Sequence, residues 1–167
     1  MENPNNANHF AMQANHPENK IIAITSGKEG IGKTWLSITL AQALSGLKQK
    51  TLFFDGDLGP SNIDAQLGLM IEADLASVIH GHKTLNQIVR HSDKGHFDVI
   101  AGRSGSSGLL SIPIGRLQIL GEDLKILSSN YDKIILDMGS GIENGVKILS
   151  GMSGHIVVLC TEEAHSL

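Results

Sequence analysis

Residues 27–34 read Gly-Lys-Glu-Gly-Ile-Gly-Lys-Thr, and this stretch decides how the rest of the sequence is interpreted. It fits the pattern of a glycine, four residues and then Gly-Lys-Thr that marks a phosphate-binding loop. Glycines let the backbone wrap an anion with its N–H groups, and the positive end of a following helix adds to the attraction. In such a loop Lys33 reaches the β- and γ-phosphates, and the hydroxyl of Thr34 is a ligand for Mg²⁺.

The flanking sequence supplies the context that a phosphate loop requires. The apolar run Ile21–Thr25 ends directly before the loop and predicts a buried strand. Beyond the loop, apolar residues recur at spacings of three and four from Leu36 to Leu47, which predicts a helix. The alternative is a chance glycine-rich turn, and a chance match in a chain of this length is on the order of one in a hundred. The strand-loop-helix context therefore favours nucleotide binding.

Further apolar runs of the same character lie along the chain, at residues 51–54, 97–101, 133–136 and 156–160. None alternates between apolar and polar residues, and continuous apolar strands are typical of a parallel sheet that helices cover on both faces. Helical patterns lie between the runs, at residues 63–69, 75–79, 117–127 and 142–149. This alternation predicts a three-layer, doubly wound α/β domain with a mainly parallel sheet.

Three aspartates follow predicted strands. Asp55 and Asp57 come after the run at residues 51–54, and Asp137 comes after the run at residues 133–136. The carboxyl ends of parallel strands meet at one rim of the sheet, so these side chains are expected beside the phosphate loop. One carboxylate can hold Mg²⁺ through water, and another can orient an attacking water. A single aspartate at such a place would more often cap a helix or start a turn, but three favour function.

Composition excludes several classes of function. The 167 residues suit one domain, and 13 basic against 17 acidic residues leave a net charge of −4, which provides no basic footprint for specific nucleic-acid binding. The single cysteine, Cys160, excludes an internal disulfide framework and a self-contained zinc or iron–sulfur site. The longest apolar runs are about six residues, against the ~20 that cross a bilayer. We expect a cytoplasmic protein whose sequence does not support membrane contact.

Other segments carry simpler expectations. Residues 1–19 are rich in asparagine, lack a periodic apolar pattern and are expected to form a disordered tail ahead of the domain at residues 20–167. Cys160 is expected to pack in the interior as an ordinary hydrophobic residue. For Trp35, interior packing is the default expectation and contact with a partner is the alternative. The glycine- and serine-rich loop Gly102–Gly108 favours a flexible connection over a second anion-binding loop.

Three stretches together resemble the MinD/ParA ATPases. The loop Ser26–Thr34 is similar to the deviant phosphate loop of that family, whose hallmark is an extra lysine near the start of the loop, here Lys28. The stretch from Asp55 to Asp64, continued through Leu67-Gly68-Leu69, resembles the family's switch I, and Asp137–Glu143 resembles its third motif, with the Walker B aspartate and switch II. The final residues, Thr161–Leu167, are similar to a segment of the flagellar-number branch, FlhG.

The resemblance implies a MinD-like P-loop NTPase fold with ATP and Mg²⁺ as cofactors. The residues implied to contact the nucleotide are Gly27, Lys28, Glu29, Gly30, Ile31, Gly32, Lys33, Thr34 and, in the switch that senses the γ-phosphate, Asn62. The residues implied to act in hydrolysis are Lys28, which would reach the phosphates of a partner subunit, Lys33, and Asp57, which would position the attacking water. The residues implied to serve Mg²⁺ are Thr34, Asp55 and Asp137.

The sequence departs from the family pattern at three places. One is the tail around Met12-Gln13-Ala14, which does not reproduce the short N-terminal activating motif of the FlhG branch. Glu29 stands where the family usually has glycine and brings a negative charge to the loop. The chain ends at Leu167, before the base-recognition loop and the membrane-binding helix of the family, so the C-terminal part of the domain is expected to be missing. Adenine recognition is accordingly expected to be modest.

The expected function is an ATP-binding and ATP-hydrolysing switch of the MinD/FlhG type. It would form an ATP-dependent homodimer and control the placement or number of a cellular structure such as the flagellum, through a flagellar or division-site protein partner. The alternative is a nucleotide-binding regulatory module with little or no hydrolysis, acting by partner binding. A small-molecule kinase on the same fold also remains open, whereas an iron–sulfur carrier ATPase is disfavoured by the single Cys160.

Overall fold

The fold alternates strands and helices as the sequence predicts. The computed structural model describes residues 20–57, 63–102, 112–141 and 144–162. Its elements are β1 (Ile21–Ser26), α1 (Lys33–Gly46), β2 (Thr51–Asp55), α2 (Ile63–Leu67), α3 (Leu75–Ile79), α4 (Leu85–Ile88), β3 (Arg90–Ser92), β4 (Phe97–Ile100), α5 (Ile114–Ser128), β5 (Lys133–Ser140), α6 (Asn144–Gly151) and β6 (His155–Leu159).

Some of the expectations fall outside the described residues. These are the disordered tail at residues 1–19, the switch residue Asn62, the glycine- and serine-rich loop beyond Gly102, and residues 163–167 of the FlhG-like segment.

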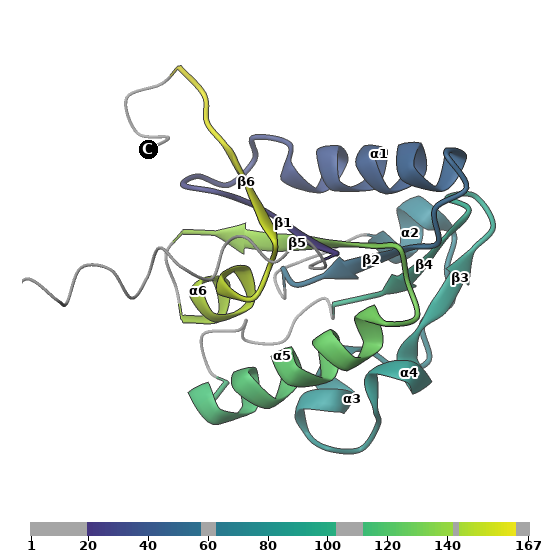
Figure 1. Ribbon diagram of the computed structural model, residues 1–167, viewed down its shortest axis with the longest axis vertical. Coiled ribbons are helices and arrows are strands. Elements are labelled where there is room, and N and C mark those ends of the chain that lie inside the picture. The colour runs from purple at the N-terminus through teal and green to yellow at the C-terminus, as the bar shows by residue number, and fades with distance from the viewer. Residues whose placement is uncertain (1–19, 58–62, 103–111, 142–143, 163–167) are drawn as a thin grey trace, which may run out of the picture.

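The sheet is mainly parallel and lies between two layers of helices (Figure 1). Its strand order is β3-β4-β2-β5-β1-β6, and every pairing is parallel except that of β3 with β4. One core cluster joins the sheet to α1 and α2, and a second joins its other face to α3, α4, α5 and α6. The predicted three-layer α/β architecture is therefore confirmed.

Helix α1 packs against the sheet with small residues as well as with its leucines. Its buried residues are Lys33, Ser37 and Ala41, spaced one turn apart, while the leucines between them are only partly buried. Small side chains on this face let the helix lie close to the sheet just behind the phosphate loop. Leu47 and Trp35 are each 72% exposed, so the expectation that Trp35 packs in the interior was wrong.

The antiparallel edge strand β3 was not predicted. Its three residues are too few to show a periodic pattern, and the turn to β4 depends on His96 in a left-handed backbone conformation, with φ 58°. A side-chain hydrogen bond helps to hold β3 against β4: His91 Nδ1 lies 2.8 Å from Asp98 Oδ1.

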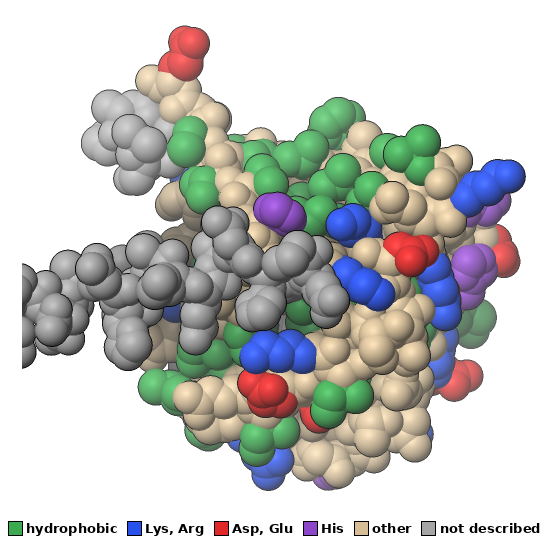
Figure 2. Space-filling model, viewed as in Figure 1, with side chains coloured by type: hydrophobic (Ala, Val, Ile, Leu, Met, Phe, Trp, Pro, Cys, Tyr) green, Lys and Arg blue, Asp and Glu red, His purple; other side chains and the backbone are tan. Residues whose placement is uncertain are grey.

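Strand β6 is an exposed edge rather than a strand with both faces covered. Ile156, Val157 and Val158 are 51%, 38% and 58% exposed, and Figure 2 shows apolar side chains gathered around β6 and α1. Cys160 lies beyond the end of β6 and is exposed, so its predicted burial was wrong. An apolar run predicts that a strand forms, but coverage of its faces depends on other elements packing against it.

Within the described part of the chain, none of the helices combines the length and apolar character needed to cross a bilayer.

Candidate functional site

The phosphate loop joins β1 to α1 and owes its shape to glycine. Gly30 and Gly32 have φ values of 76° and 92°, in the left-handed region that other residues rarely adopt, and nothing lies within 4 Å of where a Cβ would be on either. The Ser26 hydroxyl donates to the Lys28 carbonyl at 2.7 Å, which closes the start of the loop. The N-cap residue of α1 is Gly32, which has no side chain to cap the helix. The loop therefore presents an open cradle beside the positive end of a helix.

Lys33 and Asp137 lie buried beneath this loop. Lys33, the first residue of α1, is 7% exposed, and Asp137, in the middle of β5, is 1% exposed. The Asp137 carboxylate accepts hydrogen bonds from the hydroxyls of Thr34 and Ser37. Burial raises the pKa of Asp137, while these two hydrogen bonds and the positive charge of Lys33 act in the opposite direction.

Asp55 and Asp57 lie at the end of β2, on the same edge of the sheet as the phosphate loop. Asp55 is buried and pairs in register with Asp137 on the neighbouring strand, and the carboxylate of Asp55 accepts the backbone N–H of Asp57 at 3.2 Å. The carboxylate of Asp57 lies beside Gly139, where Oδ1 is 3.6 Å from the position of an added Cβ. The three aspartates therefore lie at one rim, as the sequence predicts, but Asp137 lies within β5, which runs on to Ser140, and does not follow the strand.

The loop residues around this cluster differ in accessibility. Gly27, Lys28, Glu29, Gly30 and Gly32 are exposed, whereas Ile31 and Thr34 are partly buried. The structure thus brings Lys33 and Thr34 against the aspartates and leaves the front of the loop open to solvent.

Sequence reasoning missed two residues of this site. Ser37 stands one helical turn after Lys33, and that spacing is the one signal that could have placed it on the same face of α1. Gly102 lies against Asp55, and a Cβ on Gly102 would be 3.2 Å from Asp55 Oδ2. No local pattern in the sequence indicates this second contact, because it joins the ends of β2 and β4.

The donors in the site fit a magnesium–nucleotide complex. A hydroxyl and a carboxylate are the hard oxygen ligands that Mg²⁺ takes in proteins, and Thr34 and Asp137 supply them side by side. Among the described residues, no group of three or more His, Cys, Asp or Glu side chains could hold a metal by itself. Mg²⁺ is usually bound through one or two protein groups together with substrate phosphates.

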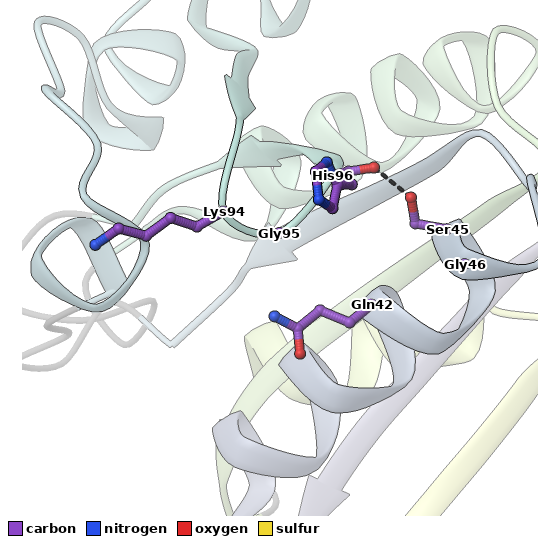
Figure 3. Close-up of a pocket in the computed structure, with 6 residues that line it drawn as sticks. All are labelled: Gln42, Ser45, Gly46, Lys94, Gly95 and His96. Carbon is purple, nitrogen blue, oxygen red and sulfur yellow. Dashed lines mark hydrogen bonds between the residues drawn. The ribbon is translucent and has the colours of Figure 1, made fainter.

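A separate cavity of about 370 Å³ lies at the other end of α1, away from the phosphate loop. Figure 3 shows it between Gln42 on α1 and the turn before β4, where the Ser45 hydroxyl donates to the His96 carbonyl. The Lys94 ammonium points away from Gln42 and lies 3.1 Å from where a Cβ on Gly68 would be. The polar groups of this cavity do not converge on one point, so it is not the candidate site.

The chain is similar to known proteins over nearly its whole length, including the phosphate loop and the aspartates beside it. The sequence profile of the AAA domain family matches residues 19–165. The antiactivator FleN of Pseudomonas aeruginosa is 31% identical over 152 residues, which make up 90% of this chain and 54% of FleN. The chain belongs to the AAA domain family as a MinD/ParA-type ATPase.

Two further relatives support the MinD/ParA-type assignment. The flagellum site-determining protein YlxH of Helicobacter pylori is 29% identical over 153 residues, 92% of this chain and 52% of YlxH. The septum site-determining protein MinD of Pyrococcus horikoshii, solved in complex with Mg-ADP, matches with a TM-score of 0.75 at 26% identity, over 86% of this chain and 58% of that one. This MinD/ParA-type chain spans about half the length of the curated relatives that it matches.

Proposed function

We propose that this chain binds ATP with Mg²⁺ at residues 27–34 and acts as a nucleotide-dependent switch. The observation that carries the proposal is the Asp137 carboxylate, buried beneath the loop and bonded to Thr34 and Ser37. In this arrangement the loop amides and Lys33 bind phosphate, and Thr34 and Asp137 serve the metal. Bound Mg²⁺ would neutralise charge that develops on the phosphates.

Hydrolysis is the second part of the proposal. Asp57 is the residue that would orient an attacking water, since Asp55 holds its backbone and its carboxylate lies at the end of β5 beside Gly139. Asp55 would contribute to the metal site indirectly. It holds the backbone of Asp57, and it lies opposite Asp137 on the neighbouring strand. Lys33 would stabilise the charge of the transferred phosphoryl group.

The switch would work through dimerisation. Lys28 is exposed at the front of the loop, where it can reach the phosphates held by a second copy. We propose that ATP closes this homodimer and that hydrolysis opens it. The likeness to FleN and YlxH supports a role in controlling the number or position of a cellular structure such as the flagellum, through a protein partner in the cytoplasm.

A second candidate is a nucleotide-binding regulatory module with little turnover. Glu29 favours it, because an exposed carboxylate next to Lys28 places a negative charge beside the bound phosphates. Both candidates require nucleotide binding, and they differ in the rate of ATP hydrolysis and in the effect of Asp57→Ala on that rate.

Binding of a fluorescent ATP analogue tests what the two candidates share. With Mg²⁺ present, the wild-type chain should bind the analogue and Lys33→Ala should abolish binding, because the buried ammonium contacts the phosphates. Lys83→Ala is the matched control, since Lys83 is an exposed lysine in a turn before α4. Equal affinity of the wild type and Lys33→Ala would overturn the phosphate-loop assignment.

A further inference from the structure

Ser37 connects α1 to β5 directly beneath the phosphate loop. Its side chain is fully buried, and its Oγ lies 2.9 Å from Asp137 Oδ1 and 2.9 Å from the carbonyl oxygen of Lys33. The residue follows Lys33 by one helical turn, so it stands on the face of α1 that packs against the sheet. It lies outside the motif that defines the loop.

The hydroxyl of Ser37 has one hydrogen to donate and two acceptors within reach. The Lys33 carbonyl already accepts a backbone N–H within the helix, as every interior carbonyl of an α-helix does. A carboxylate is a stronger acceptor than a neutral carbonyl, because the hydrogen bond is assisted by charge. The Ser37 hydroxyl therefore donates to Asp137.

The Asp137 carboxylate is held from the α1 side by two hydroxyls. Thr34 and Ser37, three residues apart on α1, both donate to it, and Asp137 is almost completely shielded from solvent. Bulk water cannot readily reorient a carboxylate at this depth. Its orientation is therefore set by these donors and by the backbone of β5.

Packing alone gives no reason for a serine at this position. Ala41 occupies the next turn on the same buried face of α1 and fills its place without a polar atom. Serine is a poorer helix former than alanine, and burying its hydroxyl costs free energy unless a partner is present. The partner here is the carboxylate of the candidate metal site.

We propose that Ser37 is a positioning residue for Mg²⁺, which acts by holding the Asp137 carboxylate in the orientation that supports the metal of a bound magnesium–nucleotide complex. The inference rests on the proposed function, because it takes Thr34 and Asp137 to serve the metal. Residues that orient metal-supporting groups typically change metal affinity by about 10–100-fold when they are removed.

The test separates metal dependence from nucleotide binding as such. A fluorescent ADP analogue is titrated onto the wild type, Ser37→Ala and Ser45→Ala, in EDTA and at a series of Mg²⁺ concentrations. Ser45→Ala makes the same chemical change at the far end of α1, where the lost hydrogen bond goes to the His96 carbonyl. Thermal unfolding of each nucleotide-free protein shows whether the variants fold.

Ser37→Ala should raise the Mg²⁺ concentration at half-maximal effect about 10-fold and leave the affinity in EDTA within about twofold. Ser45→Ala should change neither quantity. A merely structural role for Ser37 would weaken binding equally with and without Mg²⁺, and that result, or no change at all, would overturn the proposal.

Two further outcomes are decisive. Should Ser37→Ala fail to fold, Ser37→Cys keeps the side chain close in size but replaces the hydroxyl with a weak donor, and it must raise the Mg²⁺ concentration at half-maximal effect in the same way. A wild-type chain that binds the analogue without any response to Mg²⁺ would overturn the proposed function itself, and the role of Ser37 with it.

Discussion

The side chain of Asp55 holds the backbone of Asp57. Asp55 Oδ1 accepts the Asp57 N–H at 3.2 Å, and Asp55 is only 2% exposed, so this bond has little competition from water. It fixes the turn that follows β2 and keeps the Asp57 carboxylate at the end of the neighbouring strand, beside Gly139. Asp57 is therefore a side chain of defined position rather than a loose residue of an exposed loop.

Replacement of Asp57 should affect catalysis and spare binding. Asp57→Ala is expected to lower the ATP turnover rate by about 100-fold or more, which is the usual contribution of a positioned general base, and to leave nucleotide affinity within about twofold. Phosphate release at saturating ATP and Mg²⁺ measures this rate. The control is Asp93→Ala, which removes an exposed aspartate from the turn between β3 and β4. A wild-type rate no higher than that of Asp57→Ala would favour the low-turnover module instead.

A side chain at Gly102 should destabilise the fold, because Asp55 lies against this glycine. A Cβ at Gly102 would lie 3.2 Å from the backbone oxygen, Cγ and Oδ2 of Asp55, which are held by β2 and cannot easily move. Gly102→Ala is therefore expected to lower the free energy of unfolding by about 1–3 kcal/mol, the typical cost of overpacking. Urea denaturation measures the change.

Gly151→Ala is the matched control for Gly102→Ala. Gly151 ends α6, and nothing lies within 4 Å of where its Cβ would be. Alanine is the better helix former, so this variant should be as stable as the wild type or slightly more stable. Equal destabilisation by the two substitutions would contradict the close approach of Gly102 to Asp55.

Tyr131 should make the protein sensitive to alkaline pH. Burial, together with the hydrogen bond to Asp98 Oδ2 at 2.9 Å and the charge of Asp98, raises the pKa of Tyr131 well above its ordinary value. The unfolded chain releases this proton near pH 10, while the folded protein keeps it. The contribution to stability is therefore complete below about pH 10 and is lost as the pH rises toward the folded-state pKa.

Tyr131→Phe isolates this effect. The variant loses the hydrogen bond to Asp98 and should be about 1 kcal/mol less stable than the wild type at pH 7. The difference should shrink as the pH rises from 9 to 11, because only the wild type has a tyrosine at this position to ionise. Urea denaturation across this range measures both proteins, and a difference that stays constant with pH would show that Tyr131 does not titrate in this way.

Lys28 and Glu29 should have opposite effects on dimerisation. Both are exposed on the loop, and Glu29 is close enough in sequence to oppose the contact between Lys28 and the phosphates of a second copy. Glu29→Gly is expected to strengthen ATP-dependent dimerisation, because it removes a negative charge and restores backbone freedom. Lys28→Ala is expected to weaken dimerisation and to leave nucleotide binding by the monomer largely intact.

Sedimentation of the wild type and both variants, each with ATP and Mg²⁺, measures the balance of monomer and dimer. An unchanged balance in Glu29→Gly would show that the two charges do not compete. If Lys28→Ala were also without effect, the dimer model would be wrong for this chain.

Much of the fold was predictable from local pattern. The run Ile21–Thr25, the loop after it and the helix that follows are recognisable because strand, turn and helix each leave a signal within a few residues. The placement of Asp55 and Asp137 on one rim followed from a general property of parallel sheets. The short strand β3 was missed, because three residues show no period.

The surface character of several residues was not predictable. Trp35 and Cys160 are apolar in composition yet exposed, and the apolar residues of β6 lie at an open edge of the sheet. Burial depends on which distant elements pack against a residue, and the residue's own type does not contain that information. The same reasoning accounts for α1, whose fully buried residues are Lys33, Ser37 and Ala41, while Leu36, Leu40 and Leu44 pack against the core only partly buried.

The sequence by itself determined the phosphate loop, the alternation of strands with helices and the residues at the strand ends that surround the loop. These features follow from local requirements, such as the left-handed backbone at Gly30 and Gly32 that favours glycine. Only the tertiary structure decided that Ser37 bonds to Asp137 and that Gly102 lies against Asp55. Each of these contacts joins segments that are far apart in the chain, and their register is set by packing across the whole sheet.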